Sequence, residues 1–484
     1  MATVEQTAEP LRARTRTGGD VTVDAAAVHE LEDRLRGPVL RAGDEGYDEA
    51  RRIWNAMIDK RPALIARCTG AADVIDALRW SREHDLLVSV RGGGHNVAGN
   101  ALCDGGLTMD LSGLRSVHVD PAARTARAEP GVTLGDIDRE TQAFGLAVPT
   151  GIVSMTGIAG LTLGGGFGWL SRKHGLTCDN LRSADVVTAE GELLRASADE
   201  RPELFWGLRG GGGNFGIVTS FEYELHELGP EVAAGLVLYP MARAPDVLRF
   251  YREFAASGPD ELGLLAVLRL APPAPFLPES VHGQPIVGIA ACYAGPVDEG
   301  MRVLDPITER LGQPLGGGFG PRPFRAHQAM FDSGQVPGNQ QYWKSEYLAR
   351  LSDDAIETAI GFAERLTSPI TGVLIFQLAG AIARVGEEET AVSHRDAEFV
   401  LAINSGWSDA ADSDRQIEWT RDFHAAMQPF STGGVYVNFL SRDEGEDRVR
   451  AAYGDEKHRR LVELKNRFDP ENVFRVNQNI RPTV

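Results

Sequence analysis

The chain has 484 residues, of which 43% are hydrophobic and 55 are glycine, so it can form about two or three domains with sizeable cores. Asp and Glu number 68 against 49 Lys and Arg, which gives a formal net charge of −19 at pH 7. An acidic surface repels nucleic acid and anionic lipid, so we expect neither a nucleic acid nor a membrane as a partner.

The four cysteines indicate neither a metal site nor a redox pair, because no two of them are spaced as Cys-x-x-Cys. We expect free thiols in a reducing compartment and no bound metal. The first residues lack the apolar core of a signal peptide, and no apolar run approaches the roughly 20 residues that span a bilayer. The sequence therefore predicts a cytoplasmic protein.

The first predicted elements lead into a glycine loop. Residues 1–24 are polar, and we expect them to be mobile. A helix is predicted over 29–35, a strand over 63–67, and a helix over 71–84 with Val74, Ile75 and Leu78 on one face. The strand 86–90 then runs directly into three consecutive glycines. This strand–helix–strand order is typical of an α+β fold with a ligand loop at the end of a strand.

The loop after this strand combines glycines with one histidine. Glycine lets the backbone approach a ligand closely, and inward-turned amides form a concavity that suits a phosphate or pyrophosphate. The alternative is an ordinary glycine turn beside a polar histidine. The candidate binding residues here are Arg91, Gly92, Gly93, Gly94, His95, Asn96 and Gly99.

Short strands and helices follow. Strands are predicted at 107–111, 117–119 and 125–129, and Thr133 with Asp136 can cap a helix that runs to residue 143. A hairpin is predicted from 186–188 and 193–195, then a helix at 204–208 and a strand at 217–225. Gly211-x-Gly213-x-x-Gly216 matches the dinucleotide fingerprint formally, but a helix precedes it and a strand follows, so we reject a Rossmann site.

After residue 228 the pattern changes to strands that alternate with helices. Strands are predicted at 233–239, 263–270, 284–293 and 373–378, with helices at 245–255 and 353–366. These segments suit a separate α+β domain. Near the end, a helix is predicted over 455–468 with Leu461, Leu464 and Phe468 on one side.

The loop Arg-Gly-Gly-Gly-His followed by Gly99 resembles the flavin-attachment loop of the berberine-bridge-enzyme-like FAD oxidases, in the vanillyl-alcohol-oxidase superfamily. A second glycine stretch at 150–168 and the C-terminal Asp-Pro-Glu-Asn-Val-Phe also resemble this family, and the resemblance covers about residues 47–480. It implies an α+β protein with a PCMH-type FAD-binding fold over 1–228 (core about 58–228). A substrate-binding domain on an antiparallel sheet would span 229–434, and 435–484 would return to the FAD-binding domain.

The resemblance implies that His95 bonds covalently to the flavin ring and that the glycine loop holds the pyrophosphate. Further flavin contacts implied by the family pattern are Gly151, Thr156, Gly157, Gly160, Gly164, Gly168, Asn180, Gly216, Ile217, Val218, Asn477 and Asn479.

The chain departs from the family pattern at two positions. Many members attach FAD a second time through a cysteine, but Val153 stands at that position, so we predict a single bond through His95. The flavin potential should then be lower than in doubly attached relatives. The missing cysteine also disfavours an oligosaccharide substrate, because oligosaccharide oxidases of the family are usually doubly attached. Leu161 replaces a frequent histidine near the ring.

Tyr436-Val437-Asn438 resembles the family's Tyr-x-Asn motif near the flavin. Tyr436 is our candidate base, provided that positive charge or hydrogen bonding lowers its pKa. The alternative is a structural tyrosine. Asn438 is expected to hold Tyr436 or the flavin edge, and Gln377 is expected to line the substrate pocket.

Two further family signatures are expected to serve packing. The run Tyr342-Trp343-Lys344-Ser345 is one of them. His394-Arg395 is the other, and we expect Arg395 to pair with an acid.

Hydride removal from a C–H bond needs a cofactor as acceptor. The resemblance implies an FAD-dependent oxidoreductase that takes hydride from an alcohol or amine carbon of a small molecule and passes electrons to O₂. The substrate would be a secondary metabolite, an amine or a sugar. Two alternatives stay open: a dehydrogenase with poor O₂ reactivity, and a flavin-carrying protein that binds a ligand without turnover. The sequence gives no oligomeric state.

Overall fold

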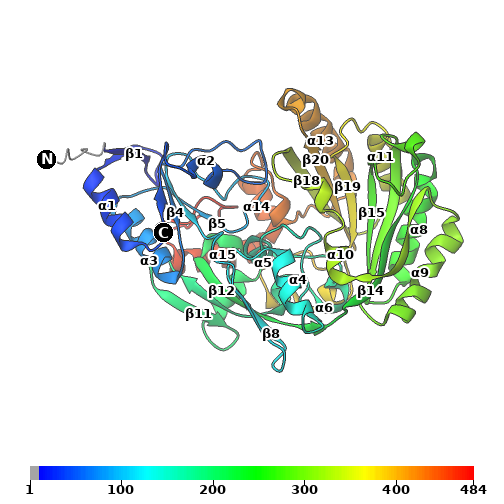
Figure 1. Cartoon of the computed structure of the whole chain (residues 1–484), viewed down its shortest axis with the longest axis horizontal. Coiled ribbons are helices and arrows are strands. Elements are labelled where there is room, and N and C mark those ends of the chain that lie inside the picture. Colours follow the sequence, from blue (N-terminus) through cyan, green and yellow to red (C-terminus); the bar gives the residue numbers. More distant parts are fainter. Residues whose placement is uncertain (1–9) are drawn as a thin grey trace.

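Three larger sheets organise the chain, whose computed structural model describes residues 10–484 (Figure 1). The four-stranded and five-stranded sheets lie together at one end of the elongated molecule, with the C-terminus. A seven-stranded sheet with its helices forms the other end.

The N-terminal segment is ordered against the first sheet. Strands β1 (Leu11–Arg14) and β2 (Asp20–Val23) form an antiparallel hairpin. The first strand of the hairpin is hydrogen-bonded to two later segments of the same polypeptide. The amide of Arg14 donates to Gly105 O (2.7 Å), and the amide of Leu87 donates to Arg14 O (2.9 Å). The prediction of a mobile segment is therefore wrong for 11–23, whereas its residues 1–9 lie outside the described part.

The four-stranded sheet carries the first glycine loop. Its order is β3 (Val39–Leu40), β4 (Leu64–Arg67), β6 (Leu107–Asp110) and β5 (Val88–Arg91), with β4 and β5 both parallel to β6. Helix α1 (Ala25–Arg34) packs against α3 (Ala71–Glu83), where Val74 and Leu78 are fully buried. The short helix α2 (Tyr47–Ala50) follows β3. The predicted strand–helix–strand start is confirmed.

The five-stranded sheet is antiparallel. Its order is β11 (Leu193–Ser197), β10 (Leu181–Val187), β12 (Ile217–Glu224), β8 (Thr125–Ala128) and β7 (Val117–Asp120). The predicted hairpin is β10–β11, with Val187 opposite Leu193. Beside this sheet, β9 (Leu146–Ala147) pairs with β13 (His226–Glu227).

The helices around this sheet follow their sequence signals. Helix α4 (Leu134–Gln142) begins at a capping box in which the amide of Thr133 donates to Asp136 Oδ2 (2.8 Å). Helix α7 (Pro202–Leu208) precedes the turn η2 (Gly212–Asn214), and β12 follows. The helix-then-strand order that excluded a Rossmann site is confirmed. The short elements α5 (Ile158–Leu163), α6 (Ser171–His174) and η1 (Thr177–Asn180) carry the second glycine stretch onward.

The seven-stranded sheet is antiparallel throughout, as the family resemblance implied for this region. Its order is β17 (Gly316–Pro323), β14 (Glu231–Pro240), β16 (Pro285–Tyr293), β15 (Leu262–Leu270), β19 (Gly372–Gln377), β20 (Phe399–Trp407) and β18 (Gln340–Leu348).

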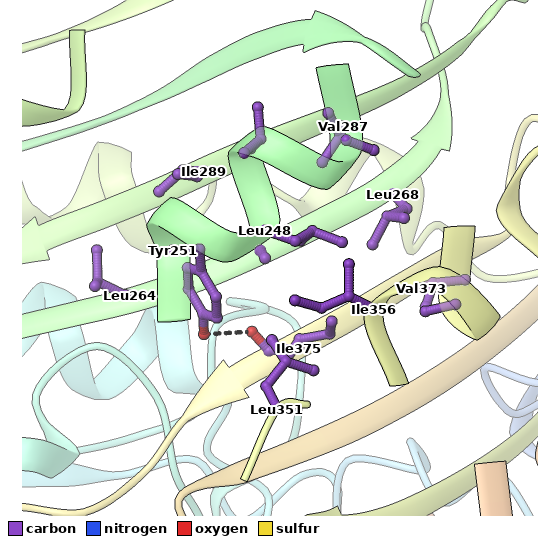
Figure 2. Close-up of a cluster of buried hydrophobic side chains, with 14 of the residues drawn as sticks. Leu248, Tyr251, Leu264, Leu268, Val287, Ile289, Leu351, Ile356, Val373 and Ile375 are labelled. Atoms are coloured by element: carbon purple, nitrogen blue, oxygen red, sulfur yellow. Dashed lines mark hydrogen bonds between the residues drawn. The ribbon is translucent and has the colours of Figure 1, made fainter. Parts of the chain in front are cut away.

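The four longest helices of this region cover one face of this sheet. They are α8 (Ala244–Ser257), α9 (Val297–Leu311), α11 (Asp353–Ala363) and α13 (Ser413–Met427). In the core beneath them, Leu248 and Tyr251 of α8 lie over Leu264 and Leu268, and the Tyr251 hydroxyl donates to Ile375 O (2.8 Å; Figure 2). Because successive strand residues point to opposite faces, Leu265, Val267 and Arg269 face the other way, toward the glycine loops.

The C-terminal segment returns to the first end of the molecule. After the turn η9 (Val437–Phe439) and helix α14 (Glu446–Tyr453), helix α15 (Asp455–Phe468) packs on α7, with Leu461 and Leu464 buried. The predicted helix is confirmed, and the domain boundaries at 228 and 435 stay a prediction. Among residues 10–484 no helix is both long and apolar enough to cross a bilayer.

Candidate functional site

A cavity of about 350 Å³ lies between the glycine loops and the face of the seven-stranded sheet that points away from α8, α9, α11 and α13. Its volume falls within the range of small-molecule sites. The loop after β5, the second glycine stretch and the turn before β12 form one wall, and strands β15, β19, β20 and β18 form the opposite wall. Residues 436–439, 474 and 476–478 of the C-terminal segment complete the lining.

The two glycine loops touch backbone to backbone. A Cβ atom added to Gly93 would lie 2.5 Å from the Cα of Gly157, and one added to Gly92 would lie 2.8 Å from Pro130 O. Gly94 has a φ of +67°, which favours glycine. These contacts explain why the loop needs consecutive glycines, and they leave backbone rather than side chains facing the cavity.

His95 is held in the cavity wall by an aromatic stack. Its ring lies parallel to that of Trp54, with centroids 4.2 Å apart, and Trp54 meets Trp343 edge-on at 5.2 Å. Burial lowers the pKa of His95 to about 4, so the imidazole is neutral at pH 7. Its Nε2 atom is buried without a hydrogen-bond partner among the described residues. This ring nitrogen, with no protein partner, leaves a polar contact for a bound molecule.

Tyr436 is also buried in the wall, where its phenolic oxygen accepts two hydrogen bonds. The donors are the amide of Gly166 and Nδ2 of Asn438, each at 2.9 Å. Burial raises the pKa of Tyr436 well above its ordinary value, and the two hydrogen bonds oppose this only in part. The condition set for a base, a lowered pKa, is not met, and the catalytic role of Tyr436 stays a prediction. The protonated phenol keeps its own O–H for donation.

The asparagines near the cavity are fixed by main-chain carbonyls. Asn438 Nδ2 also lies 3.2 Å from Leu161 O, and its side chain fills the space beside Gly164. Asn477 Nδ2 donates to Gly213 O (3.1 Å) and to Phe474 O (3.0 Å), which leaves its Oδ1 buried without a partner in the described chain. These contacts order the wall and keep one amide oxygen for a ligand.

The structure brings most of the predicted site residues together. Those that line the cavity are Gly92, Gly93, Gly94, His95, Asn96, Gly151, Thr156, Gly157, Gly160, Gly216, Ile217, Val218, Tyr436, Asn438 and Asn477.

Several predicted cofactor residues lie behind the wall instead. Arg91 Nη1 donates to Ala50 O, and Asn180 Nδ2 donates to the carbonyls of His174 and Leu176 at 2.9 and 2.8 Å. The others support neighbouring backbone or side chains, or border an adjacent groove. They are Gly99 against Ile58, Gly164 against Asn438, Gly168 against Thr150, and Asn479.

Gln377 does not line the cavity, so its predicted place in a substrate pocket is wrong. It is the last residue of β19, where Gly372, Leu374 and Phe376 face the cavity. Strand alternation turns Gln377 to the opposite face, and its Nε2 donates to Ala255 O of α8 (2.6 Å).

The sequence analysis missed the contribution of the sheet. Arg269, Asn404, Phe376 and Trp343 line the cavity from four adjacent strands. The one available signal was Arg269, a charge near the end of an otherwise apolar predicted strand. Trp54, which stacks on His95, lies in a segment without any periodic pattern.

The predicted partner of Arg395 is confirmed. Its guanidinium binds both carboxylate oxygens of Asp179, at 2.6 and 3.0 Å, in a buried pair. The pair ties the loop after α12 (Ala381–Arg384) to η1, and so it fixes the chain that follows the second glycine stretch.

Together these residues fit a flavin cofactor. The exposed backbone of the glycine loops suits a flat ring and phosphates, while the buried, unpartnered His95 Nε2 and Asn477 Oδ1 offer polar contacts.

Comparisons with known proteins agree with this fit. Residues 62–197 match the family model described as an FAD binding domain, and 435–481 match the model described as berberine and berberine like. An FAD-linked oxidoreductase from Dictyostelium discoideum is 31% identical over 461 residues, which covers 94% of this chain and 97% of that protein.

Two solved structures are also similar. The 6-hydroxy-D-nicotine oxidase from Arthrobacter nicotinovorans superposes with a TM-score of 0.81 at 31% identity, over 92% of this chain and 98% of that chain. Glucooligosaccharide oxidase from Acremonium strictum, whose FAD is 6-S-cysteinyl and 8α-N1-histidyl, has a TM-score of 0.83 at 22% identity. That match covers 95% of this chain and 100% of that chain.

The fold and the cavity define an FAD-dependent oxidoreductase that acts on a small molecule. The chain belongs to the berberine-bridge-enzyme-like family of FAD-linked oxidoreductases, and the predicted PCMH-type fold is confirmed.

Proposed function

We propose that this enzyme holds FAD through a single covalent bond to His95. The neutral imidazole and the unpartnered Nε2 support His95 as the attached residue. Val153 lines the cavity at the place where doubly attached members of the family have a cysteine. Cys178 is buried and does not line the cavity, so it offers no second attachment.

The residues assigned to the cofactor are those of the glycine wall. We propose that the amides of Gly92 to Gly94 face the pyrophosphate and that Gly216 to Val218 border the far end of FAD. Asn438 and Asn477 then order the wall around the ring. FAD, when bound, supplies the hydride acceptor and passes two electrons to O₂, which gives H₂O₂.

We further propose an amine rather than an alcohol as the substrate. An alcohol has to lose its O–H proton as hydride leaves, so it needs a base beside it. The ionisable side chains that line the cavity, among residues 10–484, are His95, Arg269 and Tyr436. A tethered histidine, an arginine and a phenol with a raised pKa do not supply that base. A neutral amine needs none, because its own lone pair stabilises the iminium that forms when hydride leaves.

Tyr436 has a different role in this proposal. As a protonated phenol it donates a hydrogen bond into the cavity, while Gly166 and Asn438 fix its oxygen. It therefore orients whatever accepts that bond and takes up no proton. Water then hydrolyses the released iminium to a carbonyl compound and an amine.

The test is flavin bleaching without oxygen, using matched pairs such as N-methylbenzylamine and benzyl alcohol. We expect the amine to bleach the flavin absorbance and the alcohol to leave it unchanged. Faster bleaching by the alcohol contradicts the amine proposal. Admission of air should restore the colour within seconds, whereas recovery over many minutes contradicts the assignment of O₂ as acceptor.

A further inference from the structure

Four residues form a row across the sheet wall of the cavity. Arg269 of β15 lies opposite Gly372 of β19, Gly372 lies opposite Asn404 of β20, and Asn404 lies opposite Trp343 of β18. Residues directly opposite on adjacent antiparallel strands point to the same face. All four line the cavity, so the row presents a cation, a gap, an amide and an indole to a ligand.

The gap in this row is at Gly372. A Cβ atom at this position would have one neighbour within 4 Å, Leu374 Cδ2 at 3.8 Å. Its φ does not lie in the left-handed region, so the backbone does not demand glycine here. The missing side chain leaves room between the guanidinium of Arg269 and the amide of Asn404 for a small group of a ligand.

Arg269 lacks a protein counter-ion. Its Nε and Nη2 donate to two main-chain carbonyls, Leu270 O at 3.3 Å and Pro369 O at 3.1 Å. Within the described chain it forms no ion pair, and its Nη1 lies beside Gly334 in the cavity lining. Burial lowers the pKa of Arg269, and no acid among the described residues counteracts this shift. By contrast, both Nη1 and Nη2 of Arg395 donate hydrogen bonds to the carboxylate of Asp179.

The cavity lining carries one positive charge, that of Arg269. His95 is neutral, Tyr436 is protonated, and no Asp, Glu or Lys of residues 10–484 lines the cavity. The whole chain has a net charge of −19 and repels anions, so an anion is held only where a local cation faces it. One guanidinium matches one carboxylate, in the paired geometry that arginine favours.

Unused amide groups and an apolar body complete the pocket. Asn404 Oδ1 and Gln335 Oε1 are buried without partners in the described residues, and rotation of either amide presents its NH₂ group instead. Beyond them the lining is apolar, with Val267, Leu374 and Phe376 from the sheet.

We propose that Arg269 binds a carboxylate of the substrate in the gap above Gly372, so that the oxidised amine is a largely apolar molecule with one negative charge. This inference rests on the proposed amine oxidation at the same cavity.

The experiment measures binding by calorimetry on the full-length, flavin-loaded protein, with benzoate and its neutral isostere benzamide as probes. In the wild-type protein we expect benzoate to bind roughly 10- to 100-fold more tightly than benzamide, the effect of hydrogen bonds to a charged partner. Arg269→Met should bind the two equally. Arg269→Lys, which keeps the charge but loses the paired donors, should keep part of the preference.

Arg322→Met is the matched control. Arg322 lies on β17 of the same sheet, is also half-buried with a lowered pKa, and does not line the cavity. This variant should keep the wild-type preference. The inference is overturned if wild-type protein binds benzamide as tightly as benzoate, if benzoate does not bind, or if Arg269→Met retains the preference.

A kinetic arm separates this inference from the proposed function. N-benzylglycine should have a lower KM than N-benzylglycinamide in the wild-type protein, and Arg269→Met should remove the difference. If no amine is oxidised but Arg269→Met still loses the benzoate preference, the proposed function fails and the anion site stands. If amines are oxidised without any preference for the carboxylate, the inference alone fails.

Discussion

The protonation states of His95 and Tyr436 in the cavity wall are set by burial more than by neighbouring charges. Burial keeps His95 neutral and Tyr436 protonated, and both side chains are positioned by uncharged partners, a stacked indole for one and two N–H donors for the other. A neutral imidazole suits bond formation to a cofactor, and a protonated phenol suits hydrogen-bond donation. The proposed amine oxidation therefore needs no titrating acid–base pair.

The variant Tyr436→Phe tests the protonated phenol. We expect kcat to fall about 10- to 100-fold, because one hydrogen-bond donor is lost. The shape of the pH–rate profile between about pH 6 and pH 9 should not change, because Tyr436 stays protonated over this range. Steady-state rates of both proteins across this range provide the measurement. Loss of an ionisation step in the variant contradicts this assignment and restores Tyr436 as a base.

At the scale of residues, the sequence predicted which residues form the site better than it predicted their protonation and orientation. The glycine loop and His95 could be predicted because their spacing is specific to the family pattern. The protonation of Tyr436 could not, because it depends on burial by Phe167 from a distant segment as well as by the neighbouring Phe439. The turn of Gln377 away from the cavity depends on the strand register, which the sequence of one strand does not give.

At the scale of elements, the cofactor wall depends on the contact between the two glycine loops. Gly93 and Gly157 approach closely enough that neither tolerates a side chain without displacement of the other loop. This contact sets the distance between β5 and α5, from which His95 and Gly160 both reach the cavity.

Gly157→Ala should therefore destabilise the protein and displace the two glycine loops from each other. The added methyl would lie 2.7 Å from the Cα of Gly93, and such overpacking costs about 1–3 kcal/mol of the free energy of unfolding. We also expect less flavin per protein in the absorbance spectrum. Gly113→Ala is the control, because a Cβ there has no atom within 4 Å, and it should change the stability by less than about 0.5 kcal/mol in urea unfolding. Equal effects of the two changes contradict the account.

The elements themselves differ in how well their sequences predict them. Helices α3 and α15 have apolar residues on one face, and α4 has a capping box, so their limits are predicted within one or two residues. Strands β18 and β20 were not predicted as strands, because buried polar residues such as Lys344, Glu346 and Asn404 interrupt their apolar runs.

At the scale of the whole molecule, buried histidines couple stability to pH. His327, in α10 (Phe324–Gln328), packs against Trp169 with neither ring nitrogen hydrogen-bonded in the described chain. Burial lowers its pKa to about 3. Between that value and the ordinary pKa near 6.5, the unfolded state binds a proton that the folded state excludes, so acid destabilises the fold.

His327→Gln removes this proton-binding difference. Below about pH 6.5 the free energy of unfolding of the variant should rise relative to the wild-type protein, by about 1.4 kcal/mol for each pH unit. Asp138, whose pKa burial raises to about 7, has the opposite effect, but it is present in both proteins and cancels in the difference. Urea unfolding at several acidic pH values measures this difference. A difference that does not vary with pH contradicts the prediction.

The arrangement of the two ends of the molecule could be predicted only through the family resemblance. Composition and periodicity indicated a second α+β region after residue 228, but the cavity needs the sheet face to lie over the glycine loops. That arrangement rests on long-range contacts such as Lys344 with Asp443 and Glu444, at 3.2 and 3.0 Å, which no local pattern reveals. For the same reason Arg269 and Asn404 did not enter the predicted site.

The proposed tether between His95 and FAD is tested most directly by acid precipitation of the purified protein. We expect the yellow colour to stay with the pellet of the wild-type protein and of His29→Ala, a change of an exposed histidine on α1. The colour should pass into the supernatant of His95→Ala. Release of the colour from the wild-type pellet, or its retention by His95→Ala, contradicts the account.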